Sequence, residues 1–151
     1  FVWIGEPENE IEEDEFIRIP FLTEPLVAAV PRPHPLAELE EITAAQLGLP
    51  EVVISDSSSI EHYMFRQFCG NHHIAPNIIA IPGNNVLQFA VQTSNVAVLL
   101  ESSAKVCHPS GISLVKIVSS PCAQISLLYA KRRRLSPGAK DFLNFMKERS
   151  I

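Results

Sequence analysis

Short, wholly apolar runs alternate with helix signals through the middle of this chain, and this alternation limits the folds available to it. Runs without polar positions are typical of strands buried on both faces. Strands that alternate with helices predict a parallel sheet covered by helices on both sides. We therefore expect an α/β fold with a parallel-rich sheet. The runs are residues 26–30, 51–55, 77–82 and 96–100.

Further strands are expected on either side of this region. Residues 112–118 and 124–130 are rich in β-branched and other apolar residues, and residues 1–5 predict a short buried strand that ends at Gly5. The acidic segment 6–16 between the first two strands is expected to be an exposed loop.

Several polar residues mark helix starts. Thr43 with Gln46, and Ser58 with Glu61, have the spacing of capping boxes. The second of these helices is expected to bury one face, made of Ile60, Tyr63, Met64 and Phe68. Asn84 or Asn85 is expected to cap the next helix, and Ser136 followed by Pro137 begins the last one.

Composition excludes several classes of protein. The 151 residues carry a net charge of −5, which gives no general attraction to a nucleic-acid backbone. The three cysteines are an odd number with long spacings, typical of a reduced cytoplasmic protein. The chain has no apolar run near the roughly 20 residues that span a bilayer, and no signal peptide is expected at Phe1.

Three adjacent hydroxyls, Ser57, Ser58 and Ser59, follow the strand at residues 51–55. In parallel α/β sheets, ligands bind at the carboxyl ends of strands, where helix N-termini present free N–H groups. The serines are therefore candidates for a cradle that holds a polar or anionic ligand. The alternative is that one serine caps the helix and the others fill a turn.

Signals for catalysis, metals and nucleotides are weak, so we expect no enzyme, no metal site and no cofactor. His62 lies three residues after Ser59, but no G-x-S-x-G elbow accompanies it. Cys69 with His72 and His73, and Cys107 with His108, lack zinc-site spacing, so a buried Cys69 beside two exposed histidines is expected. The residues "IPGNN" are not a dinucleotide fingerprint, and "KRRR", residues 131–134, is expected to be a solvated loop rather than a phosphate site.

The order of segments resembles the effector-binding domain of LysR-type transcriptional regulators. The likeness covers nearly the whole chain, and its most specific parts are the "H-P-L-A" block and the "S-P-x-A-x-x-F" start of the last helix. The matching residues are Ile19-Pro20-Phe21, Glu24, Leu26-Val27, Pro31, His34-Pro35-Leu36-Ala37, Ile42-Thr43, Leu47 and the tail from Ser136.

The resemblance implies a periplasmic-binding-protein-like type II fold, in which two α/β lobes enclose an effector cleft. Residues 23–123 would form a complete lobe II, and residues 1–22 and 124–151 part of lobe I. The chain would cross between the lobes near residues 21–25 and 119–126. The family's winged helix-turn-helix, its linker helix and the first part of lobe I would lie upstream. DNA would therefore be bound only by that missing N-terminal domain, and the parent protein would be a cytoplasmic homo-oligomer without membrane contact.

The resemblance also extends the candidate site. We expect a small polar or anionic effector, bound by residues at strand ends, helix starts and the hinge: Gly5, Thr23, Ser57, Ser58, Ser59, Asn84 and Asn85. One departure affects this expectation, because Thr93 and Asn95 replace two glycines of the family's "V-A-x-G-x-G-I" motif. A solute-binding protein of a transport system is the alternative. The lack of a signal peptide, the unpaired cysteines and the "H-P-L-A" block favour the regulator.

Overall fold

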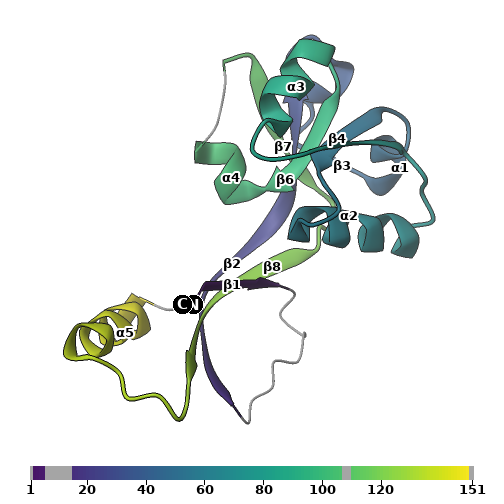
Figure 1. Ribbon diagram of the computed structural model, residues 1–151. Helices are drawn as coiled ribbons and strands as arrows, with labels where there is room; N and C mark the ends of the chain where they lie inside the picture. Colours follow the sequence, from purple (N-terminus) through teal and green to yellow (C-terminus); the bar gives the residue numbers. More distant parts are fainter. Residues whose placement is uncertain (1, 6–14, 107–109, 150–151) are drawn as a thin grey trace. The chain divides into compact units, whose positions relative to one another are not determined.

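The computed structural model describes residues 2–5, 15–106 and 110–149, which form two compact units (Figure 1). The larger unit is Pro25–Pro121, and the smaller unit holds the described residues before and after it. Residues 6–14, which contain most of the expected acidic loop, lie outside the described residues, as do Cys107 and His108.

The larger unit contains most of the alternating pattern. In chain order its elements are the second part of β2 (Phe16–Pro31), η1 (Pro35–Glu38), β3 (Glu41–Ile42), α1 (Ala44–Leu47), β4 (Glu51–Ser55), α2 (Ile60–Asn71), β5 (Asn77–Ile81), α3 (Val86–Thr93), β6 (Val96–Leu100), α4 (Glu101–Val106) and β7 (Ile112–Ile117). The four apolar runs of the sequence therefore became β2, β4, β5 and β6, as predicted.

The sheet of the larger unit is mixed rather than wholly parallel. Strands β5, β4 and β6 are parallel neighbours, with Val53 opposite both Ile79 and Ala97. Strand β2 runs antiparallel to β6 and to β7, so the expectation that the first apolar run joins a parallel sheet was wrong. The direction follows from the point at which β2 enters the larger unit. Leu26, the first residue of β2 that pairs with β6, lies opposite Leu100 at the carboxyl end of β6, so the two strands run in opposite directions.

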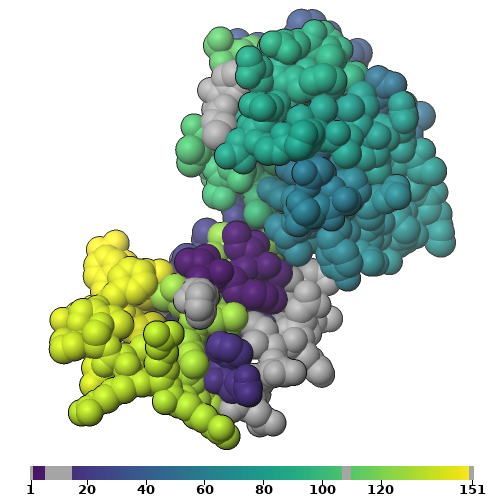
Figure 2. All heavy atoms as spheres, viewed as in Figure 1, coloured from purple at the N-terminus to yellow at the C-terminus, as the bar shows by residue number. Residues whose placement is uncertain are grey.

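Helices cover both faces of this sheet, which explains its continuously apolar strands. On one face, Val53 of β4 and Ala97 and Leu99 of β6 pack with residues of α3 and α4. The alternate residues of the same strands, such as Val52 and Val98, are fully buried on the other face, and helix α2 contacts β4 and β6. In the space-filling view the larger unit is one closely filled body (Figure 2).

Two predicted helix starts are confirmed. At α1 the Gln46 N–H donates to Thr43 Oγ1 at 3.3 Å, and the Thr43 N–H donates to Gln46 Oε1 at 2.9 Å, which completes the capping box. At α5 (Pro137–Arg149) the Ala139 N–H donates to Ser136 Oγ at 3.3 Å.

The buried face of α2 differs from the prediction. Its buried residues are Met64, Phe65, Phe68 and Cys69, whereas Tyr63 is 46% exposed. The helix is rotated so that the aromatic ring at position 65 enters the core instead of the one at position 63. Burial raises the pKa of the Cys69 thiol, and His72 and His73 are exposed, as expected.

The smaller unit is built from β1 (Val2–Gly5), the first part of β2, β8 (Cys122–Ala130) and α5. Strand β1 pairs antiparallel with β8 and ends the strand order of the described residues. Its residues Val2 and Ile4 are 64% and 41% exposed, so the prediction that the whole strand is buried was wrong. The basic run 131–134 is an exposed turn after β8.

One side-chain cluster organises the sheet of the smaller unit. The Arg18 guanidinium lies 4.3 Å from the ring centre of Trp3, donates to Ser126 Oγ at 3.3 Å and also donates to the side chain of Gln124. Ser126 is fully buried. A Cβ atom at Gly5 would overlap the indole ring of Trp3, so glycine at this position is explained by packing within the sheet.

Candidate functional site

The parallel strands β4, β5 and β6 end at the same edge of the sheet, and each is followed by a helix. In α/β folds this edge is the usual place for a ligand, because the helix N-termini leave backbone N–H groups unpaired there. Four residues separate β4 from α2 and β5 from α3, and α4 follows β6 directly.

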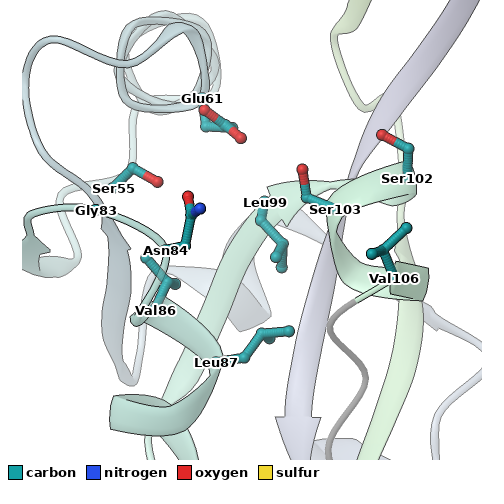
Figure 3. Close-up of a pocket in the computed structure, with 10 residues that line it drawn as sticks. All are labelled: Ser55, Glu61, Gly83, Asn84, Val86, Leu87, Leu99, Ser102, Ser103 and Val106. Carbon is teal, nitrogen blue, oxygen red and sulfur yellow. The ribbon is translucent and has the colours of Figure 1, made fainter.

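A cavity of about 290 Å³ lies at this edge, wholly within the larger unit (Figure 3). Residues from the ends of β4 and β6, from the β5–α3 loop and from the three helices line it. They are Ser55, Glu61, Gly83, Asn84, Val86, Leu87, Leu99, Ser102, Ser103 and Val106.

The cavity has one apolar part and one polar part. In Figure 3 the side chains of Leu99 and Leu87 lie in the middle of the cavity, with Val86 on the side of Asn84 and Val106 on the side of α4. On one side the Ser55 hydroxyl and the Asn84 amide lie below the Glu61 carboxylate, and the hydroxyls of Ser102 and Ser103 lie on the opposite side, on α4. A small ligand with both an apolar and a polar part therefore fits this arrangement.

Local sequence explains why these groups meet. Ser55 is the last residue of β4, and its carbonyl accepts a 2.9 Å hydrogen bond from Nδ1 of His62 on α2. Gly83 has φ +73°, a left-handed conformation that glycine adopts at low cost, and it turns the chain so that Asn84 follows at the cavity. These two features hold the ends of β4 and β5 in place beside the helix starts.

The serine cluster serves the start of α2. Ser59 is the N-cap, and its Oγ accepts the His62 N–H at 3.1 Å. The Ser58 N–H and hydroxyl both donate to Asp56 Oδ1, at 3.1 and 2.5 Å. The predicted capping box of Ser58 with Glu61 was therefore wrong, because Asp56 engages Ser58 in a turn and the helix begins one residue later.

The other predicted site residues are distributed as follows. Asn84 lines the cavity, and Asn85 is the N-cap residue of α3 without a side-chain capping bond. Ser57 and Ser58 are exposed, and none of the three serines lines the cavity. Gly5 is buried and Thr23 is exposed, both in the smaller unit. Their contacts with an effector stay a prediction.

Sequence reasoning missed Ser55, Glu61, Ser102 and Ser103, although a usable signal was present. The rule that drew attention to the serines after β4 applies equally to the residues after β6. There "VAVLL" is followed at once by "ESS", residues 101–103.

Thr93 and Asn95, which stand where the family motif has glycines, lie at the other edge of the sheet. Thr93 Oγ1 donates to the Phe89 carbonyl at 2.8 Å at the end of α3, and the Asn95 N–H donates to the Ala90 carbonyl. Asn95 Nδ2 also donates to Glu51 Oε2 at 3.4 Å, at the first residue of β4. These residues precede β6, so they are at the amino edge, and the cavity at the carboxyl edge does not depend on them.

The contacts of His62 show what its ring does beside the cavity. The His62 ring bonds the backbone carbonyl of Ser55 rather than a serine hydroxyl, so it positions a strand end and activates no nucleophile. Among the described residues, no group of three or more His, Cys, Asp or Glu side chains is arranged to hold a metal ion. None of the described helices is long and apolar enough to cross a membrane.

Replacing Ser59 by alanine is expected to lower the free energy of unfolding by about 1 kcal/mol, because it removes the N-cap hydrogen bond of α2. Ser57→Ala is the matched control, since Ser57 is exposed in the same turn and should leave stability nearly unchanged. Urea unfolding of the three proteins measures the difference. Equal losses in both variants would contradict the assignment of Ser59 as the cap.

The turn before α2 also predicts a pH dependence. The hydrogen bonds from the Ser58 hydroxyl and N–H lower the pKa of Asp56 from its usual 3.8, and the charge of His62 adds to the effect. The ionised carboxylate therefore stabilises the fold above about pH 4, and this contribution is lost as the pH falls through the lowered value. Unfolding experiments on wild type and Asp56→Asn should show a stability difference that shrinks below pH 4. A difference that stays constant with pH would contradict it.

Comparison with known proteins identifies the family. The sequence model of the family described as "LysR substrate binding domain" matches residues 2–150, so the chain belongs to this family. The chain is 27% identical over 150 residues to the Hca operon transcriptional activator HcaR of Escherichia coli (strain K12). That match covers 97% of this chain and 50% of HcaR, so the chain spans about half the length of this curated relative.

Solved structures share the fold. The regulatory domain of CcmR from Synechocystis PCC6803, in complex with 2-PG, has a TM-score of 0.81 at 19% identity, over 99% of this chain and 73% of that one. The effector-binding domain of QuiR, in complex with shikimate, has a TM-score of 0.75 at 16% identity, over 99% and 71% of the two chains. The predicted fold class, α/β of the periplasmic-binding-protein-like type II kind, is confirmed.

Proposed function

We propose that this chain is the ligand-sensing regulatory domain of a LysR-type transcription factor, and that a small polar effector binds at the carboxyl edge of β4, β5 and β6. Binding would modulate the DNA binding and transcriptional activity of the full-length protein. Family membership supports the regulatory class. The observation that carries the site is the cavity, where polar groups from three strand ends and helix starts surround an apolar floor.

Sensing requires no reaction. A ligand shifts a conformational equilibrium when it binds one state more tightly than the other, and hydrogen bonds at helix starts supply such a difference. We infer that the domain has no enzymatic activity of its own and works in the cytoplasm. A solute-binding role in transport is not favoured, because the matched family and the curated relative are transcriptional regulators.

DNA contact is proposed to come from parts of the regulator other than this chain. With 17 acidic and 12 basic residues, the chain carries a net charge of −5 and repels phosphate backbones. In a gel-shift experiment at physiological salt, the isolated chain should not retard operator DNA. Tight, salt-sensitive retardation by the chain alone would contradict this division of roles.

We also propose that the regulator is a homo-oligomer and that the smaller unit contributes to association. Its exposed apolar side chains support this, because large apolar patches on soluble proteins mark interaction surfaces. They are Val2 (64% exposed), Ile4 (41%), Phe142 (52%) and Phe145 (48%). Light scattering at rising protein concentration should show a rising mass, and a constant monomer mass would argue against it.

The site proposal is tested by alanine substitution in the intact regulator. Asn84→Ala and Ser103→Ala each remove one polar group of the cavity, and Ser57→Ala removes an exposed hydroxyl outside its lining. In a reporter assay, the two cavity variants should require more effector for half-maximal response, while Ser57→Ala should respond like wild type. If Ser57→Ala alone shifts the response, the serine turn and not the cavity holds the effector.

A further inference from the structure

The charge inside the cavity points to the kind of effector that it accepts. Glu61 is the only ionisable side chain among the described residues that line the cavity. In Figure 3 its carboxylate lies on the same side as the Ser55 hydroxyl and the Asn84 amide. The remaining polar lining groups are neutral hydroxyls and one amide, which adapt to donors and acceptors alike. Glu61 therefore sets the electrostatic character of the polar part.

The Glu61 carboxylate has no partner among the described residues. It makes no hydrogen bond and no ion pair there, in contrast to Glu101, which pairs with Lys105 at 3.0 Å. Glu61 is half-buried at the second position of α2, where a negative charge interacts favourably with the helix N-terminus. That interaction contributes to stability, but it leaves the carboxylate oxygens available as acceptors at the cavity.

We infer that the effector carries a cationic or N–H-donating head group on a small apolar body, and that Glu61 selects for this head group. This inference rests on the proposed function of the cavity. A donor beside Glu61 forms a charge-assisted hydrogen bond, whereas an anion in the same place meets a like charge in a partly desolvated site. The apolar body would pack on Val86, Leu87, Leu99 and Val106.

The main alternative is an effector with an anionic head group. The N-termini of α2, α3 and α4 meet at the cavity, and helix N-termini attract anions. On the Ser55 and Asn84 side the nearest helix starts are those of α2 and α3, and their partial positive charges, about one half of a unit each, together only offset the charge of the Glu61 carboxylate. A head group bound directly to the carboxylate oxygens therefore meets an acceptor, which favours a donor over an anion at that position.

Three probes with one apolar body test the inference: benzylamine, benzyl alcohol and benzoate present a cation, a neutral donor and an anion. Each is titrated into the 151-residue chain while the NMR amide signals of Ser55, Asn84 and Ser103 are followed. We expect benzylamine to bind at least about tenfold more tightly than benzoate. A hydrogen bond to a charged group typically changes the binding affinity by about tenfold or more. We expect Glu61→Gln to weaken benzylamine about ten- to a hundredfold, and to weaken benzyl alcohol less, because Gln Oε1 still accepts a hydrogen bond from its neutral hydroxyl.

Glu101→Gln is the matched control. It removes one negative charge from the same molecule, but Glu101 does not line the cavity, so the ratio of benzylamine to benzoate affinity should stay as in wild type. Equal losses in both variants would show that net charge alone attracts the amine, and would overturn the role of Glu61.

The outcomes separate this inference from the proposed function. If benzoate binds the wild-type cavity more tightly than benzylamine, the cavity is a ligand site but the selection by Glu61 is refuted. If no probe shifts the three cavity signals at the highest soluble concentration, both the inference and the placement of the effector site in this cavity fail.

Discussion

Replacing Phe65 by alanine is expected to lower the free energy of unfolding by about 3–5 kcal/mol. Phe65 is one of the largest fully buried side chains, and it lies on the face of α2 that packs against the sheet of the larger unit. The loss combines the transfer of a large ring to water with the cavity left behind. Because domains are stable by only about 5–15 kcal/mol, the variant should be partly unfolded well below the wild-type melting temperature.

Tyr63→Ala is the matched control for this prediction. Tyr63 lies on the same helix, only two residues away, but it is 46% exposed. Its replacement should cost less than about 1 kcal/mol, as is usual for surface positions. Denaturant unfolding of the larger unit separates the two variants. The reverse order, with Tyr63→Ala the more damaging, would support the helix orientation that the sequence pattern predicted and contradict the structure.

Replacing Ser103 by tryptophan is expected to abolish binding at the cavity. Ser103 is half-buried at the start of α4, and its hydroxyl lies at the polar part of the cavity opposite Asn84. An indole ring at this position fills much of a space of about 290 Å³, so a ligand and the ring cannot occupy it together. Binding of benzylamine, followed by calorimetry or NMR, should fall below detection.

Lys105→Trp serves as the control for the filled cavity. Lys105 is on the same short helix with its side chain 63% exposed, and it does not line the cavity. This variant adds the same indole ring outside the site and should bind the probe as wild type does. Thermal unfolding of both variants shows whether they remain folded. Undiminished binding by folded Ser103→Trp would place the ligand elsewhere.

Much of the fold followed from the sequence because strand burial leaves a strong pattern. The runs that became β2, β4, β5 and β6 have apolar residues in succession, and such runs need helices on both faces. The capping box of Thr43 and Gln46 was also readable, since its two hydrogen bonds depend on residues only three apart.

The direction of β2 and the rotation of α2 about its axis could not be predicted from the apolar pattern. The antiparallel course of β2 depends on where the chain enters the larger unit, which is a property of topology and not of the residues within the strand. The choice between Tyr63 and Phe65 for the core depends on a small rotation of α2, because both positions belong to plausible apolar stripes.

The candidate site was only partly predictable for a related reason. Asn84 followed from the rule that ligands meet strand ends, but the serines after β4 turned out to serve the turn and the cap. Asp56 accepts the Ser58 N–H, and Ser59 rather than Ser58 is the N-cap of α2. Glu61 lines the cavity, although its spacing from Ser58 in the sequence indicated a capping role.

We have proposed that the effector binds at the edge of the sheet formed by β4, β5 and β6. A crystallographic screen of small polar fragments against the protein tests it most directly. We expect bound fragments to cluster in the cavity and to contact Ser55, Asn84 or Ser103, with amines placed next to Glu61. Fragments that bind repeatedly elsewhere on the larger unit, while this cavity stays empty, would contradict it.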